Sequence, residues 1–164
     1  MHTGDNSSGN MFTVKNIIRL LAILLEIICF LPTFVVSCGN RSENVNVVMG
    51  ITGYKDTSGM GMDTDGSLWL LILIVIPVIL FAIWFLNNVL TEKSMTIIAM
   101  VLTVSDLVLW NVFKSNVSTI ASEMQCEFQT TTWFTLNLIL LFILLVIFIL
   151  LIAKKAILDR PLIS

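Results

Sequence analysis

Two carboxylates, Glu26 and Asp106, stand inside long apolar runs of the sequence. An acidic side chain within a membrane-spanning segment is a candidate functional group by default, because it can bind a proton or a cation. Two ionised carboxylates in hydrocarbon would be very unfavourable, so at least one is expected to be protonated. We expect both acids to face the interior of a helical bundle and to approach each other. The alternative is a structural role, in which a protonated acid hydrogen-bonds between helices.

Two cysteines, Cys38 and Cys126, fall in polar stretches between apolar runs. If both stretches lie on the outer side of a membrane, these thiols can form a disulfide in an oxidising compartment. Two free thiols are the alternative. The segment Val35-Val36-Ser37-Cys38 also resembles a bacterial lipobox, although it lacks leucine three positions before the cysteine. That resemblance implies a lipoprotein lipidated at Cys38, with three spans after it.

Motifs typical of enzymes and metal sites are missing from the sequence. The only histidine is His2, and the three cysteines form no CxxC pair. There is no GxSxG motif and no glycine-rich phosphate loop. We therefore expect a protein that is not an enzyme and that needs no metal or cofactor.

The composition is that of an integral membrane protein. Hydrophobic residues make up 57% of the 164 residues and charged residues only 12%, whereas a soluble domain carries about 25% charged residues. There are too few charges to cover a soluble surface, so the lipid bilayer is the first expected partner. The net charge of −2 gives no indication of nucleic-acid binding.

Four apolar runs are long enough to cross a hydrocarbon layer of ~30 Å. They cover residues 17–37, 68–86, 95–113 and 133–153. The predicted fold is an all-α, four-helix membrane bundle, a single domain over residues 15–164 behind a flexible cytoplasmic tail at 1–14. Polar residues predict external loops at 38–67 and 114–132. Partial alternation of polar and apolar residues over 44–49 predicts a short strand or β-hairpin in the first loop.

The distribution of cations sets the expected orientation. With a cytoplasmic N-terminus, six Lys and Arg residues lie inside and three outside, in agreement with the positive-inside rule. The inside group is Lys15, Arg19, Lys93, Lys154, Lys155 and Arg160, and the outside group is Arg41, Lys55 and Lys114. We therefore expect a multi-pass protein of the cell membrane with both termini in the cytoplasm and an acidic outer face.

The run from Cys29 to Gly39 carries a family resemblance. Its pattern, CFxLPxxxVSCxG, resembles a segment at the outer end of the first helix in a group of uncharacterised small membrane proteins of Gram-positive bacteria. The resemblance implies a compartment and a layout, and no activity. Two glycosylation sequons, Asn40-Arg41-Ser42 and Asn116-Val117-Ser118, are also compatible with a eukaryotic source.

The functional expectation follows from compartment and charge. We expect an interaction, accessory or envelope-sensing component that binds another membrane protein, or a second copy of itself, through its acidic outer loops. The alternative is a component of proton- or cation-coupled transport that uses Glu26 and Asp106.

Overall fold

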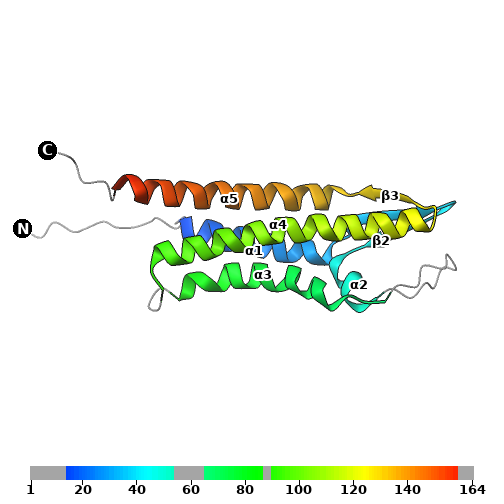
Figure 1. The fold of residues 1–164 in the computed structure, drawn as a ribbon, viewed down its shortest axis with the longest axis horizontal. Coiled ribbons are helices and arrows are strands. Elements are labelled where there is room, and N and C mark those ends of the chain that lie inside the picture. The colour runs from blue at the N-terminus through cyan, green and yellow to red at the C-terminus, as the bar shows by residue number, and fades with distance from the viewer. Residues whose placement is uncertain (1–13, 54–64, 87–89, 159–164) are drawn as a thin grey trace, which may run out of the picture.

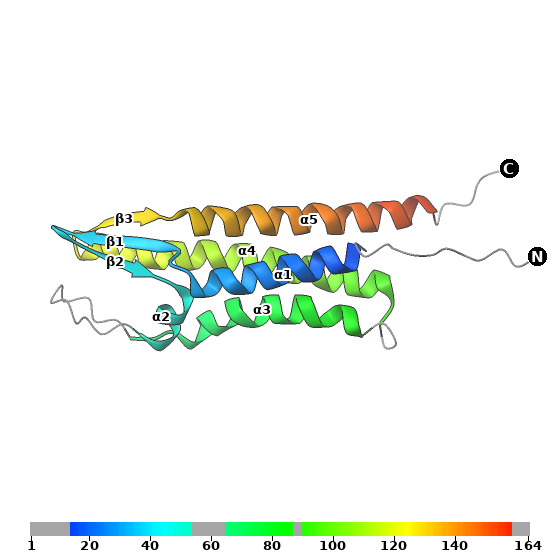
Figure 2. The ribbon, with the colours of Figure 1, turned by 180° about the vertical axis from the view of Figure 1, so that it is seen from behind.

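The computed structural model describes residues 14–53, 65–86 and 90–158, with side chains described as far as residue 154. The predicted tail, residues 1–14, lies almost wholly outside this part of the chain. Long helices lie side by side, and a small sheet sits at one end of them (Figures 1 and 2). In chain order the elements are α1 (Val14–Phe30), β1 (Phe34–Cys38), β2 (Arg41–Val45), α2 (Val47–Thr52), the 3-10 helix η1 (Leu68–Leu70), α3 (Leu71–Ala82), the 3-10 helix η2 (Ile83–Phe85), α4 (Glu92–Glu123), β3 (Glu127–Thr130) and α5 (Thr132–Leu158).

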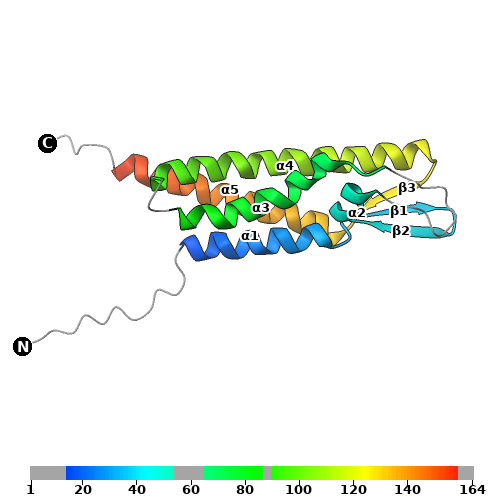
Figure 3. The ribbon, with the colours of Figure 1, turned by 90° about the horizontal axis from the view of Figure 1, so that it is seen from below.

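The long helices form a ring of four. Helix α1 packs against α3 and α5, and α4 packs against the same two helices. Figure 3 accordingly shows α1 and α4 on opposite sides, with α3 and α5 between them. The start of α1 and the end of α5 lie at one end of the ring, and the sheet lies at the other. We call these the terminal end and the sheet end.

Three helices are long and apolar enough to cross a membrane. They cover Leu68–Phe85, Glu92–Glu123 and Thr132–Lys154. The predicted runs 68–86, 95–113 and 133–153 coincide with them or lie inside them. The expectation of a membrane protein with long apolar helices is confirmed to this extent.

The predicted first span, 17–37, is wrong in its last third. Helix α1 ends at Phe30, after 17 residues, and Phe34–Cys38 forms strand β1. Pro32 has no N–H to donate, and it disfavours helical backbone at the residue before it. The polar groups released by this break are bonded by the sheet: Thr33 N donates to Val45 O at 3.0 Å, and Thr131 Oγ1 donates to Pro32 O at 2.7 Å.

An aromatic cluster fixes β1 as a strand. Phe34 is fully buried, and its ring centroid lies 5.1–5.4 Å from those of Phe113, Phe128 and Phe134. These three rings come from α4, β3 and α5. The strand therefore joins the sheet to the helices through apolar contact.

The sheet also corrects the all-α prediction. It has three antiparallel strands in the order β2-β1-β3, so β3 pairs with β1 from far along the chain. The expected hairpin is present, but at 34–45 rather than 44–49. Val47–Thr52 is instead the short helix α2, whose N-cap Asn46 accepts a hydrogen bond from Met49 N at 2.9 Å.

The predicted loop 114–132 is wrong as well. Helix α4 continues to Glu123, so its 32 residues extend about 48 Å and the last third runs beside the sheet (Figure 1). Phe113, Val117 and Ala121 are buried at intervals of four residues, which continues the packed face of the helix. The helix stops where Gln125 adopts a left-handed φ of 58° and Cys126 N donates to Ala121 O at 2.8 Å.

A disulfide joins Cys38 to Cys126 across the end of the β1–β3 pair. Their Cα atoms lie 4.6 Å apart, within the usual range of about 4.4–6.8 Å. The two cysteines are 88 positions apart in the chain. The bond therefore ties the end of the first hairpin to the turn between α4 and α5.

The disulfide generates a stability prediction. The free energy of unfolding of the double variant Cys38→Ser/Cys126→Ser should be lower by about 2–4 kcal/mol, because a cross-link over a long loop restricts the unfolded chain. Hydrogen exchange of the purified protein in detergent should show faster exchange in β1 and β3, with α5 unchanged. Reductant should produce the same change in the wild-type protein and none in the double variant. Equal protection of the sheet in both proteins would contradict a structural role for the bond.

Candidate functional site

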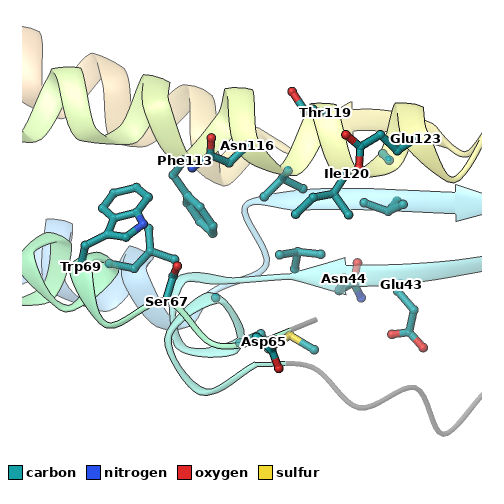
Figure 4. Close-up of a pocket in the computed structure, with 17 residues that line it drawn as sticks. Glu43, Asn44, Asp65, Ser67, Trp69, Phe113, Asn116, Thr119, Ile120 and Glu123 are labelled. Carbon is teal, nitrogen blue, oxygen red and sulfur yellow. The ribbon is translucent and has the colours of Figure 1, made fainter. Parts of the chain in front are cut away.

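The structure offers two candidate sites. The first is a cavity of about 350 Å³ at the sheet end, which we call the sheet-end cavity (Figure 4). Its lining comes from β1, β2, α2, η1, the segment before η1, and α4. The lining residues are Val36, Glu43, Asn44, Val45, Met49, Gly50, Asp65, Ser67, Trp69, Leu70, Phe113, Asn116, Val117, Thr119, Ile120, Ala121 and Glu123. A volume of this size falls at the lower end of the range for small-ligand pockets.

The cavity is acidic toward one end and aromatic toward the other. Glu43 and Glu123 lie toward the strands, whereas Trp69 and Phe113 lie toward the helices (Figure 4). Asp65 adds a third carboxylate, and no Lys or Arg is among the described lining residues. Such a cavity suits a ligand in which a positively charged group lies next to an apolar one.

Two glycines allow one wall of the cavity to form. Gly66 lies directly against the backbone at the end of α2, where an added Cβ would overlap Ile51 O. At Gly50 an added Cβ would lie 2.6 Å from Leu70 Cδ1 and 3.1 Å from the ring of Phe113, which are both side-chain atoms rather than backbone. The hydrogen bond from Ser67 N to Gly50 O, at 2.8 Å, holds the two segments together.

The second candidate site lies inside the ring of helices. Asp106 on α4 and Asn137 on α5 are fully buried, and the two side-chain polar atoms of each have no hydrogen-bond partner. Glu26 on α1 is partly buried, and its Oε2 also lacks a partner. We call these three side chains the polar layer. Buried polar groups are nearly always paired in native proteins, so three without partners require an explanation.

The members of the polar layer lie at a similar level. The rings of Trp110 and Phe134 are 6.2 Å apart between α4 and α5. Asp106 lies one turn further from the sheet than Trp110. Asn137 lies three residues further from the sheet than Phe134. Counted from that ring contact at ~1.5 Å per residue, Asp106 is about 6 Å and Asn137 about 4.5 Å further along its helix. Glu26 is close enough to Asp106 for their charges to interact.

Helix α3 contributes a backbone group nearby. Pro77 has no N–H, so the carbonyl of Leu73 lacks the usual hydrogen bond from the residue four positions later. The buried thiol of Cys29 approaches this carbonyl, with Sγ 3.5 Å from Leu73 O. Cys29 also lies within electrostatic range of both acids.

Sequence reasoning identified some of these residues and missed others. It singled out both acids and both cysteines, and the structure buries Asp106 and bonds Cys38 to Cys126. It did not select Asn137, although this is the one strongly polar side chain in an apolar run of twenty-one residues. It also treated Asn116 as a loop sequon, whereas the structure places Asn116 on α4 at the sheet-end cavity.

Comparison with known proteins adds no family assignment. No protein-family model, curated protein or solved structure matches the chain. Among the described residues, no three His, Cys, Asp or Glu side chains gather into a metal-binding group. The likeness to small Gram-positive membrane proteins therefore stays a prediction.

The two glycines give a test of the cavity wall. Gly66→Ala should destabilise the protein by about 1–3 kcal/mol, because the backbone at Ile51 cannot move away alone. Gly50→Ala is the matched control, since an added Cβ there meets only the side chains of Leu70 and Phe113, which can shift more readily than backbone, and alanine is better than glycine in a helix by about 1 kcal/mol. Thermal unfolding in detergent compares the two variants. If Gly50→Ala destabilised the protein as much as Gly66→Ala, the described packing would be contradicted.

Proposed function

We propose that this protein is a four-span membrane component that recognises a partner through the sheet-end cavity and has no catalytic activity of its own. The acidic and aromatic lining of that cavity is the observation that carries the proposal. The partner we propose is a basic segment of another membrane protein, in which Lys or Arg stands next to apolar residues. The carboxylates would attract the cation, and Trp69 and Phe113 would contact the apolar part.

The fourth span in this proposal is α1. Its 17 residues extend about 25 Å, which is near the lower limit for crossing a hydrocarbon layer of ~30 Å. Its exposed face is apolar, with Leu20, Ile23 and Ile27 each between 45% and 52% exposed. An exposed apolar face of this kind supports contact with lipid rather than water.

Charge supports an outer position for the sheet end. The cations Lys15, Arg19, Lys93 and Lys154 all lie near the terminal end of the helices. Among the described residues, the sheet end carries four carboxylates, Glu43, Asp65, Glu123 and Glu127, and two cations, Arg41 and Lys114, which agrees with the positive-inside rule. A disulfide at the same end fits an oxidising exterior.

The disulfide also weighs against the lipoprotein alternative. Lipidation needs the Cys38 thiol, and this sulfur is bonded to Cys126 in the structure. The two modifications of Cys38 exclude each other, and our proposal takes the disulfide.

Transport remains a second candidate function, and the polar layer favours it. Neutralising Asp106 should then abolish transport while partner binding at the sheet-end cavity survives. A pure interaction role predicts the reverse, because the cavity acids would matter and Asp106 would tolerate substitution by Asn.

Topology can be tested by cysteine labelling in intact cells. A single cysteine replacing the exposed Gln129 on β3 should react with an impermeant maleimide, because the sheet end is proposed to be outside. A cysteine replacing the exposed Lys93 should react only after permeabilisation. The parent protein, with Cys29 buried and the other two thiols bonded, is the control. Labelling at position 93 from outside would contradict the proposed orientation.

Partner recognition can be tested by photo-cross-linking in native membranes. A photoreactive residue at Thr119, which lines the cavity, should cross-link to a peptide containing Lys or Arg, identified by mass spectrometry. The double variant Glu43→Gln/Glu123→Gln should lower the yield about tenfold or more, which corresponds to ~1.4 kcal/mol. Ser115, exposed on α4 and outside the lining, is the matched control position. Equal yields at both positions, or no effect of the double variant, would contradict the proposed partner.

A further inference from the structure

The polar layer brings two carboxyl groups and one amide into the interior, and several of their buried atoms have no hydrogen-bond partner among the described residues. Two oxygens of Asp106, one of Glu26 and both amide atoms of Asn137 have no hydrogen-bond partner. An unpaired charge in an apolar interior is far more unfavourable than an unpaired neutral group. The interior therefore needs a species that can pair with several of these atoms together.

The nearest described basic side chains are engaged elsewhere. Arg19 donates to Trp84 O at 3.2 Å and lies over the ring of Phe85, at the terminal end. Lys114 lies over the ring of Phe134, toward the sheet end. It is eight residues from Asp106 along α4, or about 12 Å. Neither cation belongs to the polar layer.

A proton alone, or water alone, would not satisfy all the buried atoms of the polar layer. A protonated Asp106 would be neutral, but the amide nitrogen of Asn137 would still have no acceptor among the described residues. Water molecules could pair with the amide, but they would not balance the charge of an ionised carboxylate. Oxygens from several side chains can coordinate one cation at once, and water can complete its coordination shell.

We propose that the polar layer is a binding site for a monovalent metal cation of the sodium type. The side-chain donors are carboxylate and amide oxygens, which hard cations prefer over nitrogen or sulfur. One carboxylate, that of Asp106, is fully buried and matches a single positive charge. Glu26, only partly buried, lies on α1 across the ring and would stand toward the entry side of the site. This site is separate from the sheet-end cavity, so each proposal can fail alone.

The test is direct binding of radioactive sodium to the purified full-length protein in detergent. Equilibrium dialysis at constant pH, with choline replacing sodium, should show saturable binding of about one ion per chain. Asp106→Asn should weaken binding about tenfold or more, the factor equivalent to ~1.4 kcal/mol. Asn137→Leu should also weaken it, whereas the matched control Glu127→Gln, exposed on β3 and outside both candidate sites, should bind as the wild type does.

Thermal unfolding keeps the proposal falsifiable if a variant does not fold. The melting temperature of the wild-type protein should rise with sodium concentration at constant ionic strength, because a ligand of the folded state stabilises it. Absence of saturable sodium binding by the wild type would overturn the proposal. A wild-type melting temperature that responds to acid but not to sodium would also overturn it, in favour of a bound proton.

Discussion

The break in α1 at Pro32 is the constraint on which the sheet end depends. Once the helix stops, the backbone groups of residues 31–33 need partners, since unpaired buried groups are strongly unfavourable. Strand β2 and the segment before α5 supply them, through the bonds of Thr33 with Val45 and of Thr131 with Pro32. These bonds bring three distant stretches of chain together at one end of the helices.

The sheet-end cavity is a consequence of that convergence. Strand β1 pairs on both edges, and its Phe34 anchors it to the helices through an aromatic cluster. The extended end of α4 then faces the hairpin across the space that α2 and Trp69 close. The Cys38–Cys126 disulfide holds the far end of the β1–β3 pair. The recognition site that we propose there would need little rearrangement to bind a partner, because the sheet, the helices and the disulfide hold its walls in place.

The sequence predicted the long apolar helices, the residues of the disulfide and a short hairpin, but it placed that hairpin at 44–49 and did not predict strand β1 or its pairing with β3. An apolar run such as Phe34–Val36 fits a buried strand as well as a helix, so periodicity alone could not separate the two. The last part of α4 was missed because the polar residues after Lys114 suggested a loop. The buried face of the helix nevertheless continues there through Val117 and Ala121. Pairing between β1 and β3 depends on contacts between distant residues, which no local pattern reports.

The central claim is that the ring of helices lies in a bilayer, with α1 as a full span. Spin labels placed singly at Leu20, Ile23 and Ile27, on the exposed face of α1, test this most directly in liposomes. We predict high accessibility to oxygen and low accessibility to a water-soluble nickel chelate at Ile23, with the opposite result for a label at Gln129 on β3. High nickel accessibility at all three positions of α1 would contradict the account, because the helix would then lie in water.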